Sequence, residues 1–264
     1  MSSKALKVLV LTGPGTNCDA ETVFAFNRLG CKVTEKSLRV FSGNPGELES
    51  YEILVLPGGF TYGDYLGAGT LYASDLKHTM ADEITEFISN GKFIIGICNG
   101  FQILAKCGLL PALEKPFEDP SVTLEVNKSL RFEDRWIYLK PEGSSFWTKK
   151  LPKLITLPVA HAEGRFTVRD KKVLRLLETN GQIILRYATN DGTPPRYPAN
   201  PNGSEAHIAA ITDKTGQIMG MMPHPERFML AEHHPSHTRG NFSGEPHGAL
   251  LLSNLVNEAR SRFS

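Results

Sequence analysis

The segment with the clearest chemical signature is Gly96-Ile97-Cys98-Asn99-Gly100. An aliphatic run leads directly into Cys98, and a helical pattern begins at the next residue. Glycines on either side of the cysteine allow the sharp, strained strand-to-helix turn that carries the nucleophile in many hydrolases. The N-terminus of the following helix favours the thiolate, which is the nucleophilic form of cysteine. The pattern predicts Cys98 as a catalytic nucleophile; the alternative is a small buried cysteine with a packing role.

A second segment, Met222-Pro223-His224-Pro225-Glu226, offers a base for that thiol. In an extended backbone, residues i and i+2 point to the same side, so His224 and Glu226 share a face. The carboxylate can then orient the imidazole and stabilise its charged form. Taken alone, this segment is equally typical of a strand-to-loop turn. Together with Cys98, it predicts a Cys-His-Glu triad.

Acyl transfer also needs hydrogen-bond donors for the oxygen that becomes negative in its transition state. Leu56-Pro57-Gly58-Gly59-Phe60 carries two glycines whose amide groups no side chain obstructs. We expect an amide of Gly58 or Gly59, together with the amide of Asn99, to form this oxyanion hole. A simple tight turn is the alternative.

The elements that must position these segments form a regular pattern in the first half of the chain. Short aliphatic runs are typical of strands buried on both faces, and they alternate here with helical patterns. Strands are predicted at residues 6–11, 32–35, 53–56 and 93–97, and helices are predicted to begin at Asp19, at Ser74 or Asp75, and at Asn99. Such alternation favours βαβ units. The predicted fold class is α/β, with an open, mostly parallel central sheet and helices on both faces.

The second half of the chain has a different pattern. Five strand-like runs follow one another without obvious helices between them, at residues 122–126, 130–139, 155–159, 183–188 and 207–212. They are expected to be antiparallel additions to the same sheet or a small second sheet. Residues 193–204 and 231–246 are typical of loops, and a short helix ends the chain. Because no linker is apparent, residues 1–264 are predicted to form a single domain.

Composition excludes several classes of function. With 29 Lys and Arg against 28 Asp and Glu, the formal charge is +1, which gives no electrostatic reason to expect nucleic acid or a membrane as partner. Neither common phosphate-binding glycine motif is present, so ATP chemistry on this chain is not supported. The N-terminal apolar run is too short for a signal peptide and no apolar stretch reaches 18 residues, so a cytoplasmic location is expected.

Cysteines and histidines do not form a metal-binding pattern. The four cysteines contain no Cys-x-x-Cys pair. His233, His234 and His237 lie in a segment rich in Pro, Ser and Gly, which favours a solvated loop over a metal site. No metal is therefore expected.

At this level of detail the sequence resembles a known family. It is similar to the class I glutamine amidotransferases and, within them, to the stand-alone glutaminase subunits of phosphoribosylformylglycinamidine synthase. The matching segments keep their order and rough spacing over nearly the whole chain. They are residues 13–19 (GPGTNCD), 57–66 (PGGFTYGDYL), 96–104 (GICNGFQIL), 158–166 (PVAHAEGRF), 202–204 (NGS) and 220–227 (GMMPHPER).

The resemblance implies a glutaminase subunit of purine biosynthesis. Cys98 would attack the side-chain amide of L-glutamine, His224 would transfer protons, and Glu226 would orient the histidine. Gln102 and His161 lie in family segments near the glutamine pocket and are carried over as substrate-binding residues.

Partners follow from the same resemblance. The released ammonia would pass to an ATP-dependent synthetase subunit that converts formylglycinamide ribonucleotide to formylglycinamidine ribonucleotide, and a small accessory subunit occurs in the family. ATP and magnesium are expected on that partner, and no cofactor is expected on this chain. Glutaminase activity of the isolated chain is expected to be weak or absent and to rise on complex formation.

Two other functions remain compatible with the motifs. The first is a cysteine hydrolase of the same fold that cleaves γ-glutamyl or peptide bonds, and the second is a non-catalytic scaffold subunit. Two departures from the family pattern also stand out. Gly67 occupies a position where the family commonly has an arginine, and residues 231–246 form a longer segment than in compact relatives.

Overall fold

The first half of the chain builds alternating strands and helices, as the sequence predicts. The computed structural model describes residues 5–118, 120–240, 242 and 244–263. The elements of this half are β1 (Lys7–Thr12), α1 (Asp19–Arg28), β2 (Lys32–Ser37), α2 (Leu38–Phe41), β3 (Ile53–Leu56), α3 (Thr70–Ser89), β4 (Phe93–Ile97) and α4 (Asn99–Lys106). Strands β3 and β4 are buried along their whole length, because helices cover both faces of the sheet there.

The second half adds mostly antiparallel strands. Its elements are β5 (Val122–Glu125), β6 (Glu133–Pro141), β7 (Ile155–His161), β8 (Arg165–Val168), α5 (Lys171–Thr179), β9 (Ile183–Ala188), β10 (Ile208–Thr212), β11 (Ile218–Met221) and α6 (His247–Phe263). Nine strands form the main sheet in the order β2-β1-β3-β4-β11-β10-β9-β6-β7, and β5 pairs with β8 in a small second sheet. The strands from β2 to β11 in this order are parallel, and the others join antiparallel. The predicted α/β fold class, with antiparallel additions, is confirmed.

Strand β11 occupies the position that matters most for the site. It is the last strand in the described part of the chain, yet it lies in the sheet directly beside β4 and parallel to it, with Met221 opposite Ile97. The amide of Cys98 donates a hydrogen bond of 2.7 Å to the carbonyl of Met221. Parallel strands end at the same edge of a sheet, so the residues after β4 and those after β11 must lie together.

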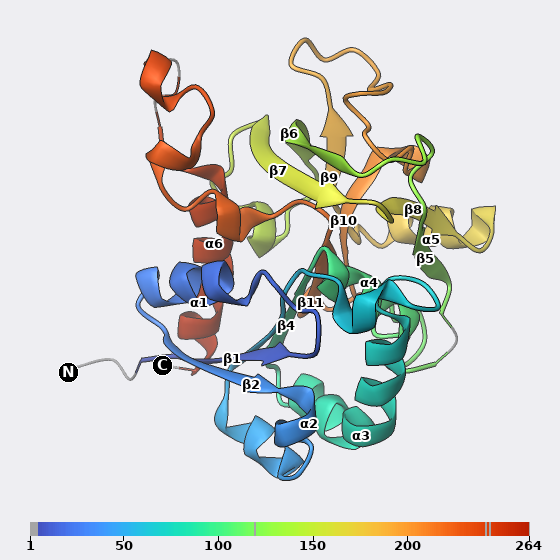
Figure 1. Ribbon diagram of the computed structural model, residues 1–264, viewed down its shortest axis with the longest axis vertical. Coiled ribbons are helices and arrows are strands. Elements are labelled where there is room, and N and C mark those ends of the chain that lie inside the picture. Colours follow the sequence, from blue (N-terminus) through green and yellow to red (C-terminus); the bar gives the residue numbers. More distant parts are fainter. Residues whose placement is uncertain (1–4, 119, 241, 243, 264) are drawn as a thin grey trace.

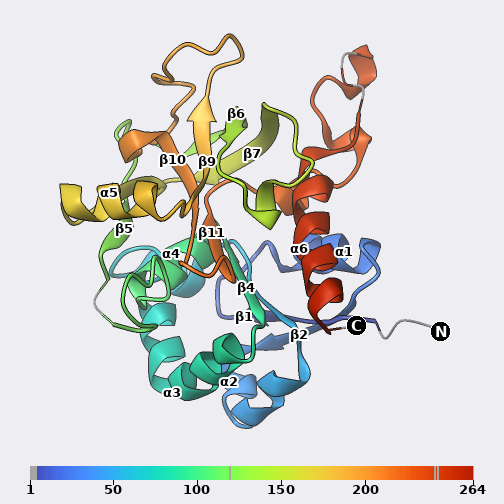
Figure 2. The same cartoon turned by 180° about the vertical axis from the view of Figure 1, so that it is seen from behind.

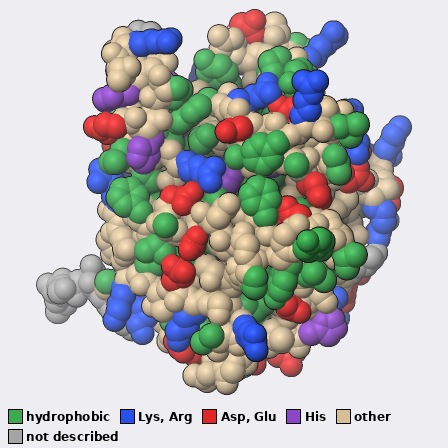
Figure 3. All heavy atoms as spheres, in the orientation of Figure 1, with side chains coloured by type: hydrophobic (Ala, Val, Ile, Leu, Met, Phe, Trp, Pro, Cys, Tyr) green, Lys and Arg blue, Asp and Glu red, His purple; other side chains and the backbone are tan. Residues whose placement is uncertain are grey.

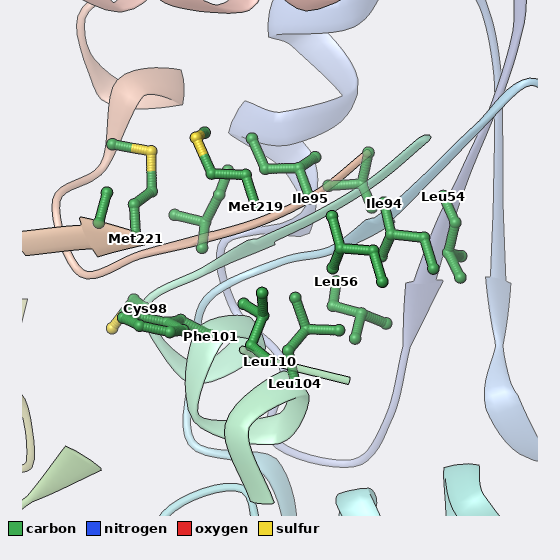
Figure 4. Packing of buried hydrophobic residues seen from close by; sticks show 14 of the residues in the cluster. Leu54, Leu56, Ile94, Ile95, Cys98, Phe101, Leu104, Leu110, Met219 and Met221 are labelled. Carbon is green, nitrogen blue, oxygen red and sulfur yellow. The ribbon is translucent and has the colours of Figure 1, made fainter. Parts of the chain in front are cut away.

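Helices cover the two faces of the parallel half of this sheet. Helices α1 and α6 lie on one side and α3 and α4 on the other (Figures 1 and 2). The close-up shows Phe101 and Leu104 of α4 packed beneath β3 and β4, while Ile95 and Met219 point to the opposite face (Figure 4). Phe101, Leu104 and Ile95 have no more than 1% of their surface exposed, so the nucleophile turn is mounted on a close-packed core.

The structure corrects four sequence predictions of elements. The sequence does not predict helix α2, helix α5 or strand β8, and α3 begins at Thr70 rather than at Ser74 or Asp75. The signal for α5 was present, since Asp170 caps the helix by accepting from the amides of Lys172 and Val173. The start of α3 follows Gly69, whose φ of 74° gives no side-chain cap and therefore no sequence signal.

The described part of the 231–246 segment is mostly exposed and contains no strand or α-helix, as predicted for a solvated loop, but one of its histidines is packed. It contains two short 3-10 turns, Ala231–His233 and His237–Arg239, and projects from the top of the molecule in Figure 1. The ring of His234 stacks on Phe242, with ring centres 4.6 Å apart, and also contacts Trp136. His234 is therefore packed among aromatic rings and not free in solvent. Residues 241 and 243 of this segment lie outside the described residues.

Two wider predictions concern the chain as a whole. Among the described residues, no helix is both long enough and apolar enough to cross a membrane. That residues 1–264 form a single domain stays a prediction, and both ends of that range lie outside the described residues.

The contact between α4 and β3 yields a stability prediction. A Cβ atom on Gly100 would lie 1.9 Å from the carbonyl oxygen of Leu56, whereas one on Gly46 would meet nothing within 4 Å. Neither the added Cβ atom nor the carbonyl oxygen of Leu56 can move away by a side-chain rotation. We therefore expect Gly100→Ala to lower the free energy of unfolding by about 3 kcal/mol. Gly46→Ala should change it by less than about 0.5 kcal/mol. Urea denaturation of both variants measures this, and equal stability of the two would contradict the packing argument.

Candidate active site

Cys98 occupies the strained turn that the sequence predicts. Its φ is 52° and its ψ is −105°, a backbone conformation that residues other than glycine rarely adopt. The residue forms the N-cap of α4, directly after β4. The close approach of Gly100 to Leu56 fixes this geometry, because α4 must start almost in contact with the neighbouring strand. The cysteine is therefore held at a helix N-terminus by packing that only glycine permits.

His224 and Glu226 form a buried pair just beyond β11. The distance between Nδ1 of His224 and Oε1 of Glu226 is 2.6 Å, and each residue has 1% of its surface exposed. The predicted meeting of the two side chains is confirmed, but its predicted basis is wrong, because the extended backbone ends at His224 and Glu226 lies in a 3-10 turn, Pro225–Arg227. The amide of His224 donates to the carbonyl of Pro158, which ties the histidine to β7. An imidazole held in this way presents its Nε2 atom on the side away from the carboxylate.

The nucleophile and the histidine converge at Gly58, in the turn after β3. A Cβ atom on Gly58 would lie 3.0 Å from Cε1 of His224 and 3.4 Å from Cβ of Cys98. Nε2 of His224 is buried without a hydrogen-bond partner among the described residues, while the Cys98 thiol donates to the carbonyl of Ala160 at 3.7 Å. The structure thus brings Cys98, His224 and Glu226 together.

The charges around His224 favour its protonated form. Burial lowers the pKa of the imidazole. The Glu226 carboxylate, the Cys98 sulfur and the Cys18 thiol all raise it, and together they outweigh burial. The net effect places the pKa of His224 well above its usual value. A protonated imidazole beside a cysteine sulfur favours the thiolate by direct charge attraction.

A second thiol, Cys18, lies in the same site and was not among the residues assigned a role from the sequence. Its Sγ would lie 2.9 Å from a Cβ on Gly58, and it accepts a hydrogen bond of 3.1 Å from Nη2 of Arg227. Burial raises the pKa of the Cys18 thiol, although His224 and Arg227 act in the opposite direction. The Cys18 thiol therefore keeps its proton to a higher pH than an ordinary cysteine does. Cys18 also lacks the strained turn that carries Cys98. The only sequence signal for it was its presence in the family segment 13–19.

Cys18, His224 and Glu226 could together hold a metal ion, since their ligand atoms lie within 4.8 Å of one another. Two existing contacts compete with that use. Oε1 of Glu226 is engaged by the imidazole, and the guanidinium of Arg227 brings a positive charge to Sγ of Cys18. Both contacts fit an acid-base site better than a metal site. That no metal binds stays a prediction.

The two predicted oxyanion donors follow β3 and β4, at the same edge of the sheet as Cys98. The carbonyl of Gly58 accepts from the amides of Asn17 and Cys18, which fixes the peptide between Gly58 and Gly59. In a trans peptide the N–H group points opposite to the carbonyl, so the Gly59 amide faces away from segment 17–18. The side chain of Asn99 accepts from Thr61, with 2.6 Å between Oδ1 and the hydroxyl oxygen. Donation to an oxyanion by Gly58, Gly59 or Asn99 stays a prediction.

Gln102 lies beside the nucleophile but its side chain is already engaged. Its Oε1 accepts from Nδ2 of Asn99 at 2.9 Å, and its Nε2 donates to the carbonyl of Glu163 at 2.5 Å. Gln102 thereby joins α4 to the segment after β7. Direct contact of Gln102 with substrate stays a prediction, and its visible role is to position Asn99.

His161, at the end of β7, is available for a ligand. Its Nδ1 lies 3.2 Å from Oδ1 of Asn127, an oxygen that also accepts from the amide of Gly164. Burial and the nearby charge of His224 lower the pKa of His161 to about 3, so its ring is neutral. Its Nε2 is buried and has no hydrogen-bond partner among the described residues. A neutral imidazole with a free lone pair can accept a hydrogen bond from a substrate, and Asn127 is the residue that orients it.

Comparisons with known proteins agree with this geometry. Residues 5–257 match the family described as CobB/CobQ-like glutamine amidotransferase domain. The chain belongs to this family. Among curated relatives, the phosphoribosylformylglycinamidine synthase subunit PurQ of Methanococcus maripaludis is 40% identical over 88% of this chain and 85% of its own length. PurQ of Dehalococcoides mccartyi is 39% identical over 97% of this chain and 98% of its own.

Solved structures place the chain in the same group. A chain in the structure of PurLQS from Thermotoga maritima aligns with a TM-score of 0.73 and 29% identity, covering 97% of this chain and 99% of that one. Together with the curated relatives, this match shows that the chain is a PurQ-type glutamine amidotransferase subunit, as the resemblance of its motifs implied.

The His224–Glu226 pair yields a pH prediction for this PurQ-type site. Because the Glu226 carboxylate raises the pKa of His224, Glu226→Gln lowers that pKa, and the imidazole loses its proton at a lower pH than in the parent. We expect glutamine hydrolysis in the complex to fall by about 10²- to 10⁴-fold and its alkaline limb to move to lower pH.

The matched control for this variant is Glu21→Gln. Glu21 pairs with Arg227 at 3.1 Å but is partly exposed and does not touch the imidazole. Its loss should change activity by no more than about fivefold, with the pH profile unmoved. A profile that stays in place in Glu226→Gln would show that this carboxylate does not control the charge of the histidine.

Proposed function

We propose that this chain hydrolyses L-glutamine through Cys98, His224 and Glu226 and delivers the ammonia to an ATP-dependent synthetase subunit that makes formylglycinamidine ribonucleotide. The observation that carries the proposal is the strained Cys98 directly after β4, beside the buried His224–Glu226 pair that follows the adjacent parallel strand β11. The names of the PurQ relatives and of the PurLQS structure support the choice of acceptor reaction.

The first half of the reaction forms a thioester. The Cys98 thiolate attacks the side-chain amide carbon of glutamine, and the carbonyl oxygen becomes negative. Amides of Gly58 or Gly59 and of Asn99 would stabilise this oxygen by hydrogen bonds. The protonated His224 then gives its proton to the amide nitrogen, the carbon–nitrogen bond breaks, and ammonia leaves. Glu226 stabilises the charged imidazole throughout, which its 2.6 Å contact with Nδ1 allows.

The second half releases glutamate. His224, now neutral, takes a proton from a water molecule that attacks the thioester carbon, and the carbon–sulfur bond breaks. The thiolate of Cys98 and the imidazolium of His224 are restored. His161, with its unpartnered Nε2, is proposed as a substrate contact near this centre.

The product determines the kind of partner. Ammonia that reaches bulk water becomes ammonium, which has no lone pair and cannot act as a nucleophile. A synthetase active site that excludes water must therefore receive it directly. ATP and magnesium belong to that subunit in this proposal, because no phosphate-binding glycine motif occurs in this chain. Four free cysteines support the cytoplasmic location expected from the sequence, since that compartment keeps thiols reduced.

Replacement of the nucleophile tests the proposal. Cys98→Ala should abolish glutamine-dependent formation of formylglycinamidine ribonucleotide in the reconstituted complex and leave the ammonia-supported reaction intact. A glutamine-analogue electrophile should label the parent chain and not this variant. Cys107→Ala is the control, because Cys107 is a buried thiol at the C-terminal end of α4, the end away from Cys98. It should keep both activities.

Other outcomes select the alternative functions. If Cys98→Ala keeps full glutamine-dependent synthesis, the chain is a scaffold and not the glutaminase. If the parent chain cleaves γ-glutamyl or peptide substrates but supports no synthesis, it is a cysteine hydrolase of another kind. Full-rate glutamine hydrolysis by the isolated chain would contradict the expected activation by the partner.

A further inference from the structure

Exposed apolar side chains are concentrated around the catalytic edge of the sheet. Among the described residues, ten large hydrophobic side chains are exposed, and eight of them lie in residues 60–66, 126–138 and 197. Hydrophobic side chains gather on the face seen in Figure 3. We call six of them the apolar rim: Phe60, Tyr65, Leu66, Leu130, Phe132 and Tyr197. Contiguous apolar surface on a soluble chain is typical of an interaction site.

Contacts between distant segments connect parts of the rim. The rings of Phe60 and Phe132 pack against each other with centres 6.2 Å apart. The guanidinium of Arg135, three residues beyond Phe132, lies over the ring of Tyr197. Phe60 directly follows Gly58-Gly59, so the rim begins at the turn that contacts Cys98 and His224.

Two leucines of the rim combine an unfavourable environment with an unfavourable backbone. Leu66 is 81% exposed with φ 64°, and Leu130 is 82% exposed with φ 55°. Leucine is disfavoured in the left-handed region, where asparagine and glycine are much better tolerated. Neither burial nor backbone preference explains these leucines in the free chain. Exposed apolar side chains of this kind are typical of surfaces that contact another molecule.

The segment that carries Tyr65 and Leu66 is bonded to the nucleophile's neighbour. The amide and the hydroxyl of Thr61 both donate to Oδ1 of Asn99, the residue after Cys98. At the other end, the amide of Ala68 donates to Oε2 of Glu163, whose carbonyl accepts from Gln102. The segment that carries Tyr65 and Leu66 is therefore joined by hydrogen bonds to Asn99 at one end and, through Glu163, to Gln102 at the other.

A basic cavity adjoins the rim. Its volume is about 490 Å³, and Lys128, Arg196 and His207 line it together with Tyr197 of the rim. No Asp or Glu lines this cavity, so it is suited to an acidic side chain on whatever covers the rim.

We propose that the synthetase subunit docks on the apolar rim, with an acidic side chain in the basic cavity, and that the segment from Thr61 to Gly69 transmits this docking to the catalytic turn. This inference rests on the proposed function, because it takes the ammonia acceptor as the occupant. Ammonia must reach that acceptor without entering water, so the covering surface has to seal the edge where Cys98 lies. The rim is the apolar surface that surrounds this edge.

The test uses a double variant, Leu66→Asn with Leu130→Asn. Asparagine tolerates positive φ, so the free chain should be as stable as the parent or more stable. Removal of two exposed apolar anchors should raise the dissociation constant of the complex with the purified synthetase subunit by about 30-fold or more. Glutamine-dependent synthesis should fall at low subunit concentration and recover at high concentration, while ammonia-supported synthesis stays unchanged.

Two further variants complete the test. Val40→Ser is the matched control, since Val40 is 70% exposed but lies in α2, outside the rim. It should bind like the parent. Arg196→Glu should weaken binding by about tenfold at low salt and less at high salt, because it reverses the charge at the basic cavity.

Each result has a definite meaning. If the double variant binds the synthetase within about threefold of the parent, the docking proposal is wrong. It is also wrong if the rim instead mediates self-association, so that the double variant loses a dimer but keeps synthetase binding. Failure of the proposed function is a separate outcome, recognised when the parent complex shows no glutamine-dependent synthesis at any concentration.

Discussion

The parallel pairing of β4 with β11 is the constraint on which the site depends. These two strands come from distant parts of the chain, and their register places Met221 opposite Ile97. Because parallel strands end at one edge, Cys98 and His224 must emerge side by side. The core beneath, with Gly100 against Leu56, leaves the turn at Cys98 no room to relax. The geometry of the reaction is thus fixed by backbone pairing, and the side chains complete it.

Electrostatics then separates the roles of groups that are chemically alike. Two thiols adjoin one imidazole, yet burial keeps Cys18 protonated while Cys98 sits at a strained helix start. Two histidines lie near each other as well. The carboxylate of Glu226 favours the charged form of His224, whereas burial without an acidic partner keeps His161 neutral. In the proposed mechanism, position in the fold therefore decides which thiol attacks and which ring carries the proton.

Strain and exposure recur together outside the catalytic turn. Left-handed backbone at Cys98 serves the nucleophile, and left-handed backbone at Leu66 and Leu130 holds apolar side chains in solvent beside it. Local free energy is given up at both places, and the surrounding packing maintains both. The shared location at one sheet edge fits a subunit whose chemistry and docking must be coordinated.

The sequence by itself determined the local features of this protein. The glycine-flanked turn of Cys98 and strands such as Ile53–Leu56 and Phe93–Ile97 depend on short-range sterics and periodicity, which neighbouring residues encode. Tertiary structure alone decided the insertion of β11 beside β4, the approach of Cys18 to the imidazole and the engagement of Gln102 by Asn99 and Glu163. These contacts join residues far apart in the chain, and no local pattern specifies which distant group will fill a given space.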